Sequence, residues 1–557
     1  GPAIVRGGLT LLRNPQGVLR VRPGRRQLPI SGFRVTADEV VLLATTATAT
    51  DPAGWELRLR SQRLTVPGTV AAGPDGSVTV TFALAADPWG SGPRPLGRGR
   101  YSVEAVLAPG ATPVPVTIAP QDFDACDAEL VTAAIAGRFL VGEDGALELA
   151  VLAPLADEER GAYHRERLRV AYRSREVAPE PRAVLFCSNR GDSATDSQLA
   201  LHHELRRRGS DLTLYWVVSD HSVALPERAV PVVRDSAEYY RVVAAAGFLC
   251  NNSDFGHWFR KRDHQRFLQT FHGYPFKTMG ISRWTDDGLS PAQIEAAVRH
   301  RRDAWDTILT PDPAMNEYYQ REFGYDGEIL SVGYPRNDAL LAAGTEQVRA
   351  RTREVVGVEP GQRAVLYAPT WRETLSTGAW SARMVDNLDL DALTEALGPD
   401  HVLLLRGHSF NARTRRRVTG SSRIVDVTDH PEINDLVLAS DLAVLDYSSL
   451  RFDYALTGKP MLFYVPDLAA YRELSRGFLY DYEPTAPGPL VCSTAELAAA
   501  VLDLDEVRRE YAAAYEQFNA RFNSRHDGHA AARVVDAFFA TAAAPAKVDP
   551  PRSGREL

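Results

Sequence analysis

Cysteine is scarce in this sequence, which has four of them among 557 residues. None forms a Cys-x-x-Cys pair, which argues against a zinc cluster or a disulfide scaffold and favours a reducing compartment; they are Cys126, Cys187, Cys250 and Cys492. Long apolar runs are missing too. One of the longest, residues 242–250, is far shorter than the roughly 18 residues that a spanning helix needs.

The sequence also lacks the marks of two other classes. Lys and Arg number 63 against 71 Asp and Glu, a net charge of −8, so no overall basic field predicts a nucleic-acid partner. The first residues show neither the charged region nor the apolar core of a signal peptide. We therefore expect a cytoplasmic protein, and leave open a peripheral contact with the inner face of the cell membrane.

What the sequence does contain is typical of a globular protein, with 45% apolar and 24% charged residues. The first part is rich in short runs of alternating polar and apolar residues, separated by Gly- and Pro-rich turns. Such runs predict the strands of a β-sandwich; they lie near 18–22, 55–60, 77–82 and 101–106. Residues 1–175 are thus expected to form an all-β, sandwich-like accessory domain.

From about residue 180 the pattern changes to continuous apolar runs that alternate with helical segments. Residues 183–187 are an example of a run that suits a strand buried on both faces. The alternation predicts two doubly wound, Rossmann-like α/β domains, over 180–345 and 346–540, followed by a loose tail over 541–557. Ligands of such sheets bind beyond the carboxyl ends of the strands.

Polar residues follow the predicted strands of the first of these domains. His272 and Gly273 come directly after a strand at 267–271, and Lys277, a candidate phosphate partner, is on the same loop. Arg336 follows a strand at 329–332 and offers a planar fork for phosphate or carboxylate. Taken alone, each has a plainer interpretation, a buried histidine bonded to a carbonyl or a solvated turn.

The second domain repeats this pattern. Arg372 closes a turn that begins with Pro369 and Thr370, and Arg406, Gly407 and His408 follow the strand at 402–405. Ser448 and Ser449 precede a helix, where they either cap it or help to bind an anion. Asp453 lies one turn inside that helix, and a donor hydroxyl is its expected partner.

The convergence of these strand ends predicts a site for a phosphorylated, nucleotide-linked ligand. The sequence has no Gly-x-x-x-x-Gly-Lys-[Ser/Thr] loop, which excludes a P-loop NTPase. It has no Gly-x-Gly-x-x-Gly after the first strand, which disfavours a nicotinamide dehydrogenase, and no His-Glu-x-x-His. We expect neither a bound metal nor a cofactor.

Several of these segments resemble, in order, the motifs of the CDP-glycerol glycerophosphotransferase family. Residues 269–277 (QTFHGYPFK) resemble its Q-T-W-H-G-T-P-L-K, and residues 333–338 (GYPRND) its G-x-P-R-N-D. Residues 367–372 (YAPTWR) and 446–454 (DYSSLRFDY) resemble two further motifs. The resemblance covers about residues 183–535, and the β-rich first part lies outside it.

The resemblance implies a GT-B-like fold whose second domain holds most of the donor. The implied reaction moves a polyol phosphate from a CDP-polyol to a hydroxyl of a teichoic-acid-like, lipid-linked or capsular polymer and releases CMP. His272 would be the general base, and His408, with Arg406, would stabilise charge on the pyrophosphate or assist the leaving CMP. The other residues implied at the donor site are Phe271, Gly273, Tyr274, Pro275, Lys277, Arg336, Pro369, Thr370, Arg372, Gly407, Ser448, Ser449 and Asp453.

Departures from the family motif leave the substrate open. Phe271 stands where the family has Trp, and residues 274–276 (YPF) replace Thr-Pro-Leu, where the polyol or acceptor would be read. Glycerol, ribitol and other polyols therefore stay candidates. Two other functions stay open as well, a GT-B glycosyltransferase that uses a nucleotide sugar and a catalytically silent polymer-binding protein. Arg413 and residues 415–417 (RRR) would contact anionic lipid or form a solvated face.

Overall fold

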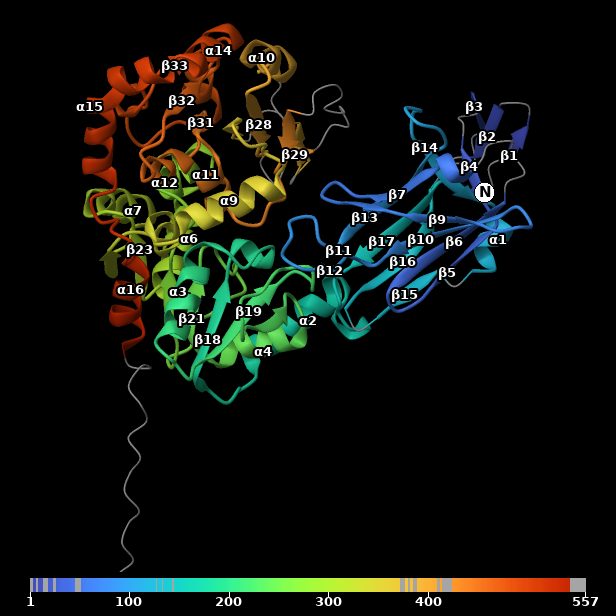
Figure 1. The fold of residues 1–557 in the computed structure, drawn as a ribbon. Coiled ribbons are helices and arrows are strands. Elements are labelled where there is room, and N and C mark those ends of the chain that lie inside the picture. The colour runs from blue at the N-terminus through green and yellow to red at the C-terminus, as the bar shows by residue number, and fades with distance from the viewer. Residues whose placement is uncertain are drawn as a thin grey trace, which may run out of the picture. The chain divides into compact units, whose positions relative to one another are not determined.

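The protein is described by a computed structural model (Figure 1). The described residues are 4–540 apart from short gaps, at 7–8, 14–18, 24–26, 46–51, 127, 133, 143–144, 371–375, 379–380, 384–387, 408–410 and 413–422. The chain divides into two compact units. The first holds residues 1–165, 218–224 and 233–236, and the second holds residues 166–217, 225–232 and 237–557.

The first unit consists mainly of short strands whose apolar side chains alternate with polar ones. Along β10 (Ser77–Ala83), for example, Val78, Val80 and Phe82 are buried and the residues between them are not. One sheet has the strand order β5-β6-β10-β9, and another has β15-β16-β17-β13-β14-β4 with β7 and β8 attached beside β13. Their strands are β4 (Leu28–Ile30), β5 (Gly32–Val35), β6 (Glu39–Thr45), β7 (Glu56–Arg60), β8 (Thr65–Pro67), β9 (Thr69–Ala72), β13 (Gly99–Val106), β14 (Val114–Ile118), β15 (Glu129–Val131), β16 (Ala136–Val141) and β17 (Leu147–Leu152).

Both sheets contribute to one apolar core, which includes Val80 and Phe82 from the first and Leu59, Val103 and Phe139 from the second. Smaller sheets join β1 (Ile4–Arg6), β2 (Leu9–Arg13) and β3 (Leu19–Pro23), and β11 (Ala85–Ala86) with β12 (Arg94–Pro95). The strands predicted near 55–60, 77–82 and 101–106 are confirmed as β7, β10 and β13.

Residues 1–175 are not wholly β, however. They include the short helix α1 (Pro120–Asp124) and the longer α2 (Gly161–Ser174). Of the α2 side chains only Tyr172 is buried, and its hydroxyl donates to the carbonyl oxygen of Arg260 at 2.6 Å. A helix with so few apolar residues gives little periodic signal, which is why the sequence reasoning missed it.

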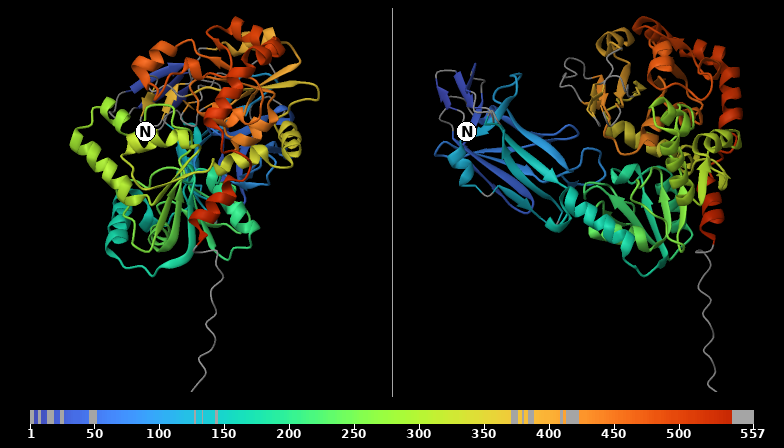
Figure 2. Two further views of the ribbon diagram at one scale, coloured as in Figure 1. Left: turned by 90° about the vertical axis from the view of Figure 1, so that its left-hand side faces the viewer. Right: turned by 180° about the vertical axis from the view of Figure 1, so that it is seen from behind.

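The first sheet of the second unit has the order β20-β19-β18-β21-β22-β23-β24. Its central strand β18 ends in five consecutive buried residues, 183–187, and helices lie on either side of the sheet (Figure 2). Its strands are β18 (Glu180–Cys187), β19 (Thr213–Val218), β20 (Val230–Val233), β21 (Ala246–Asn251), β22 (Arg266–Gln269), β23 (Thr307–Thr310) and β24 (Glu328–Ser331). Its helices are α3 (Asp196–Arg207), α4 (Ala237–Ala245), α5 (Gly280–Asp286), α6 (Pro291–Ala304) and α7 (Asn316–Phe323).

The second sheet of this unit is parallel throughout, with the order β30-β28-β25-β31-β32-β33. Its strands are β25 (Arg363–Ala368), β28 (His401–Leu405), β30 (Ile424–Asp426), β31 (Leu442–Leu445), β32 (Met461–Tyr464) and β33 (Leu490–Val491). Its helices include α8 (Asp338–Leu341), α9 (Thr345–Val355), α10 (Leu390–Leu397), α11 (Ile433–Ala439), α12 (Leu450–Ala455), α13 (Leu468–Ala470) and α14 (Thr494–Leu502). The two predicted doubly wound sheets are thus present.

Each sheet has a point where the chain reverses its direction of growth. The first grows outward from β18 through β19 and β20 and then resumes beside β18 with β21, and the second does the same around β25 and β31. Ligands of doubly wound sheets bind at the carboxyl ends of such strands. Both sheets lie in one compact unit, so their separation into domains near residue 345 stays a prediction.

The last two helices join the second sheet back to the first. After α15 (Leu504–Phe522) the chain returns and α16 (Ala530–Phe538) packs beside α3 (Figure 1). Arg266 at the start of β22 donates to the Phe538 carbonyl oxygen at 2.7 Å. Within the described part of the chain, every helix is too short or too polar to cross a bilayer.

Candidate functional site

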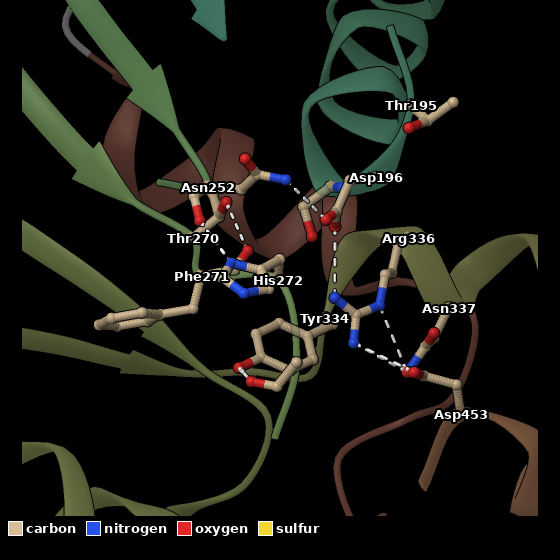
Figure 3. Close-up of polar contacts among 12 residues, drawn as sticks. Thr195, Asp196, Asn252, Thr270, Phe271, His272, Tyr334, Arg336, Asn337 and Asp453 are labelled. Carbon is tan, nitrogen blue, oxygen red and sulfur yellow. Dashed lines mark hydrogen bonds and ion pairs between the residues drawn. The ribbon is translucent and has the colours of Figure 1, made fainter. Parts of the chain in front are cut away.

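His272 lies on the loop that follows β22, and its side chain is exposed. Its ring atom Nδ1 is 2.9 Å from the main-chain oxygen of Asn252 (Figure 3). A carbonyl oxygen can only accept a hydrogen bond, so Nδ1 carries the proton and Nε2 keeps its lone pair. The alternative interpretation from the sequence was a buried histidine bonded to a carbonyl. The bond to the carbonyl oxygen is present, but the ring is exposed and Nε2 is available as a base.

Phe271, directly before His272, has a backbone φ of 52°. This left-handed conformation costs roughly 1–2 kcal/mol in a residue with a side chain. Aromatic packing holds it in place, because its ring lies 4.5 Å from that of Tyr319 and 5.6 Å from those of Trp305 and Phe323, between ring centroids. The phenylalanine thus orients the loop through packing with these rings.

Gly273 brings the base loop against the second sheet. A Cβ atom at this position would lie 2.7 Å from Ser449 Oγ, at the start of α12, so any larger residue forces a shift there. The Gly273 carbonyl oxygen accepts hydrogen bonds from the hydroxyls of Tyr334 at 3.0 Å and Tyr319 at 3.2 Å. His272 is consequently one residue away from a close contact between the two sheets.

Arg336 follows β24, in the short helix η5 (Pro335–Asn337), and its side chain is 8% exposed. Nη2 donates to both carboxylate oxygens of Asp453, at 3.0 and 3.2 Å, and Nη1 donates to Asp196 Oδ1 at 3.3 Å (Figure 3). Its main-chain oxygen also accepts from Asn434 Nδ2 at 2.8 Å. The expected fork is present, but carboxylates from both sheets occupy it.

The charges in this cluster are stabilised mutually. Burial acts to lower the pKa of Arg336, and the carboxylates of Asp453 and Asp196 outweigh it and hold the pKa above its usual value. Burial raises the pKa of Asp453, against the opposing effect of Arg336. One cation between two carboxylates leaves a formal charge of −1 beside the base loop.

Asp196 and Asn252 are site residues that the sequence reasoning missed. Asp196 begins α3, after the loop that follows β18, and Asn252 directly follows β21, so both lie at the reversal point of the first sheet. Asn252 Nδ2 donates to Asp196 Oδ2 at 2.9 Å. Asking which polar residues follow each strand would have found Asn252, whereas the contact of Asp196 with Arg336 joins positions 140 residues apart.

Tyr274, Pro275 and Lys277 lie on the same loop but differ in exposure. Tyr274 is 5% exposed, its ring stacks on Phe452 with centroids 4.3 Å apart, and its hydroxyl donates to Asn523 Oδ1 at 2.6 Å. Pro275 is buried, and Lys277 is half-buried with Nζ 5.8 Å from the centroid of the Tyr471 ring. The Tyr274 side chain thus packs and bonds inside the protein.

His526 packs against the same loops. Its Nε2 accepts from the main-chain N–H of Tyr334 at 3.1 Å. Burial, followed by the positive charge of Arg336, lowers the pKa of His526 to about 4. This histidine is therefore neutral near pH 7, and serves as an acceptor.

In the second sheet the predicted residues are held by local contacts. The Thr370 N–H and hydroxyl donate to Asp446 at 2.9 to 3.0 Å, and Pro369 before it is buried. Arg406 donates to the Val427 carbonyl oxygen at 2.9 Å, and burial lowers its pKa. Gly407 N–H donates to the Thr428 hydroxyl at 2.9 Å. The hydrogen bonds of Thr370, Arg406 and Gly407 thus hold the loops that follow the strands of the second sheet.

Ser448 and Ser449 are half-buried at the start of α12. Ser448 Oγ accepts from the N–H of Leu450 at 3.2 Å, whereas the Ser449 side chain makes no capping bond. Asp453, on the same helix, accepts from Arg336, in place of the ligand hydroxyl that the sequence suggested. Ser449 is the predicted second-sheet residue that approaches the base loop closely.

Some predicted residues fall outside the described part of the chain, namely Arg372, His408, Arg413 and residues 415–417. The role of His408 on the pyrophosphate stays a prediction. A search of the described ranges for three or more grouped His, Cys, Asp or Glu that could hold a metal ion finds none.

Known proteins match this chain over the part that carries the site. A family model described as CDP-Glycerol:Poly(glycerophosphate) glycerophosphotransferase matches residues 170–540. The teichoic acid glycerol-phosphate transferase of Staphylococcus aureus (strain NCTC 8325 / PS 47) is 32% identical over 369 residues, which are 65% of this chain and 94% of the relative. The teichoic acid poly(glycerol phosphate) polymerase of Bacillus subtilis (strain 168) is 28% identical over 362 residues, 64% of this chain.

The second of these relatives is much longer than the matched part, which spans 48% of its length. A solved structure of the wall teichoic acid polymerase TagF also matches, with a TM-score of 0.64 and 26% sequence identity. That match covers 68% of this chain and 94% of the solved chain.

Proposed function

The chain belongs to the CDP-glycerol:poly(glycerophosphate) glycerophosphotransferase family, and from that premise we propose that it transfers glycerol phosphate from CDP-glycerol to a hydroxyl of a teichoic-acid-like polymer. The observation that carries the proposal is the exposed ring of His272, whose Nδ1 is held by the Asn252 carbonyl oxygen and whose Nε2 keeps a lone pair. A neutral histidine with an accessible Nε2 has the geometry of a general base.

The transfer is a single displacement at phosphorus. His272 Nε2 takes the proton of the acceptor hydroxyl as its oxygen attacks the phosphorus atom that bears glycerol. A new P–O bond forms, the P–O bond of the pyrophosphate breaks, and CMP departs with the bridging oxygen. Much of the rate enhancement then comes from positioning and from stabilisation of charge.

The second sheet would hold the donor next to the base. Ser449 lies against Gly273, so its hydroxyl and that of Ser448 can reach a phosphate beside His272. Arg336 is bonded to Asp453 and Asp196. We therefore infer that it holds these loops together and does not contact phosphate directly. Thr370 and Arg406 would act in the same supporting way.

The finer features are part of the same proposal. A GT-B-like pair of domains would close around the donor, as the two reversal points of the sheets suggest. The acceptor would be a polyol-phosphate chain, lipid-linked or capsular, reached by peripheral contact at the inner face of the membrane. The β-rich first unit, most of which (residues 1–165) precedes the family match, is our candidate for binding that polymer.

Donor specificity tests the proposal. The full chain is incubated with CDP-glycerol, CDP-ribitol or UDP-glucose, with glycerol phosphate oligomers as acceptor, and the released nucleotide is measured by chromatography. We expect CMP from CDP-glycerol, with an acceptor that grows by glycerol phosphate units. Growth of the acceptor by ribitol phosphate units would change the identity of the polyol and leave the proposed reaction in place.

Release of UDP alone would replace this proposal by the glycosyltransferase alternative. Binding of CDP-glycerol without release of CMP would favour the silent polymer-binding alternative, and calorimetry on the same samples measures that binding.

A further inference from the structure

Two different groups of Asn252, its main-chain oxygen and its side-chain amide, make hydrogen bonds behind the base (Figure 3). His272 Nδ1 donates to the Asn252 main-chain oxygen at 2.9 Å, and Asn252 Nδ2 donates to Asp196 Oδ2 at 2.9 Å. Asp196 Oδ1 accepts from Arg336 Nη1, and Arg336 Nη2 donates to Asp453. Asn252 thus contacts both the histidine, through its backbone, and the Asp196 carboxylate, through its side chain, and the Asp196 side chain is 10% exposed.

The Asn252 carboxamide has no freedom left in this arrangement. Its Oδ1 accepts from the N–H of Asn189 at 2.9 Å, and its Nδ2 donates to Asn189 Oδ1 at 3.2 Å as well as to Asp196. Both polar atoms of the side chain have partners, and the main-chain N–H of Asn252 donates to the Cys187 carbonyl oxygen at 3.3 Å, so the side chain and the backbone of this residue are both held.

Backbone strain is concentrated on the same loops. Six residues other than glycine have a positive φ in the described part of the chain; two of them bond to Asn252, one directly precedes His272, and one, Arg190, directly follows Asn189. These four are Asn189 at 48°, Arg190 at 60°, Asp196 at 67° and Phe271 at 52°. Such conformations persist only where surrounding contacts hold them, and they gather at functional sites.

The other charged groups around these hydrogen bonds come from several elements. Asp196 is on α3, Arg336 on η5 and Asp453 on α12, and Glu432, before α11, is near enough to interact electrostatically with Asp196. The Tyr319 and Tyr334 hydroxyls also meet the base loop, and burial raises the pKa of both above the working range. Asp196 is the carboxylate bonded to the asparagine that holds the ring.

We propose that Asp196 and Asn252 are positioning residues for His272, which fix its tautomer and stabilise the imidazolium that forms when the acceptor proton arrives. The effect on catalysis rests on the proposed function, whereas the effect on the His272 ring rests on geometry alone. The carbonyl dipole orients the ring, and the carboxylate behind it supplies the negative charge.

Asp196→Asn is the variant that tests this. Asparagine tolerates a φ of 67° and keeps the shape of the side chain, so the substitution removes the charge with little backbone cost. Removing a nearby negative charge makes the imidazolium less stable, so we expect the acid limb of kcat/KM for CMP release to move about half a pH unit lower. We expect kcat to fall about tenfold.

Ring NMR of histidine-labelled full chain gives a readout without turnover. The signal of His272 is assigned by its loss in His272→Ala. We expect the Nδ1–H tautomer in the unaltered chain and, in Asp196→Asn, a downward shift of the His272 pKa that parallels the acid limb. Asp196→Gly, which relieves the left-handed backbone, serves as a second variant if Asp196→Asn does not fold.

Asp441→Asn is the matched control. Asp441 is also bonded to arginine side chains, Arg349 at 2.6 Å and Arg353 at 3.1 Å, but precedes β31 at the opposite end of the second sheet from Ser448. We expect it to lower stability and to leave the acid limb and the His272 pKa in place.

The two proposals fail in different ways. An unmoved His272 pKa in both Asp196 variants overturns the positioning proposal, even if the unaltered chain releases CMP. Absence of CMP release from the unaltered chain contradicts the proposed function, while the NMR comparison still decides whether Asp196 acts on His272.

Discussion

The carboxyl ends of the two sheets in the second unit differ in how they hold their polar residues. At the first sheet, His272 is held through Asn252 and Asp196 by contacts between distant loops, next to residues with positive φ. At the second sheet, Thr370 bonds to the neighbouring strand end at Asp446 and Arg406 to carbonyls of a nearby loop. All described positive-φ residues other than glycine come before residue 272.

The difference indicates that the two sheets have different roles in the site. On the side that carries the base, surrounding contacts hold residues with positive φ and an ion cluster around Arg336 in place. At the side expected to hold the donor, the described residues show no positive φ outside glycine, and the Ser449 hydroxyl lies beside the base loop.

The largest effect should come from Arg336. Arg336→Met leaves Asp453 and Asp196 buried without their cation, which should lower the free energy of unfolding by about 3–5 kcal/mol. Arg353→Met is the control at the opposite end of the second sheet, because Asp441 keeps Arg349, and it should cost about 1 kcal/mol. Denaturant titration measures both, and equal losses would remove the contrast between the two ends.

Phe271 tests the backbone strain. Phe271→Ala should cost about 2–3 kcal/mol through lost packing, and Phe271→Gly should be about 1 kcal/mol more stable than Phe271→Ala because glycine accepts a φ of 52°. At Phe259, a buried ring with no positive φ, the order should be reversed. Thermal unfolding ranks the four variants, and the same order at both positions contradicts the assignment of strain.

Gly273 tests the contact between the sheets. Gly273→Ala places a Cβ 2.7 Å from Ser449 Oγ and should cost about 1 kcal/mol. In a Ser449→Ala background most of that cost should disappear, because the oxygen in the way is gone. A double-mutant cycle by denaturant titration gives the coupling, and additive losses would mean that the two residues do not meet.

Glu432 should make the free energy of unfolding depend on pH. Burial raises its pKa from 4.5 to about 7, so the folded chain binds more protons than the unfolded chain between these values. Its contribution to stability is present below about pH 4.5 and is lost as the pH rises to about 7. Glu432→Gln should flatten the fall in unfolding free energy over this window. An unchanged dependence of that free energy on pH would show that the pKa of Glu432 is not raised.

Much of the fold followed from the apolar runs. The strand predicted at 183–187 is part of β18, and the one at 402–405 is part of β28, because a strand buried on both faces leaves a continuous apolar signature. The helix α5 was missed, since it follows the base loop with no periodic apolar face, and β22 ends at Gln269 where the sequence suggested Phe271.

The site was predictable as a set of strand ends and not as a set of contacts. His272 and Ser449 could be placed from their positions after strands, whereas Arg336 was expected to meet phosphate and instead meets Asp453 and Asp196. Burial decides that outcome, and burial of one arginine depends on elements more than 100 residues away.

The central claim is that His272 Nε2 takes the acceptor proton, and His272→Ala tests it most directly. CMP release from CDP-glycerol is measured with the unaltered chain and the variant, alongside donor affinity by calorimetry. We expect kcat to fall about 10²–10⁴-fold in the variant, with donor affinity kept within about twofold. A variant that releases CMP at close to the unaltered rate would contradict this claim.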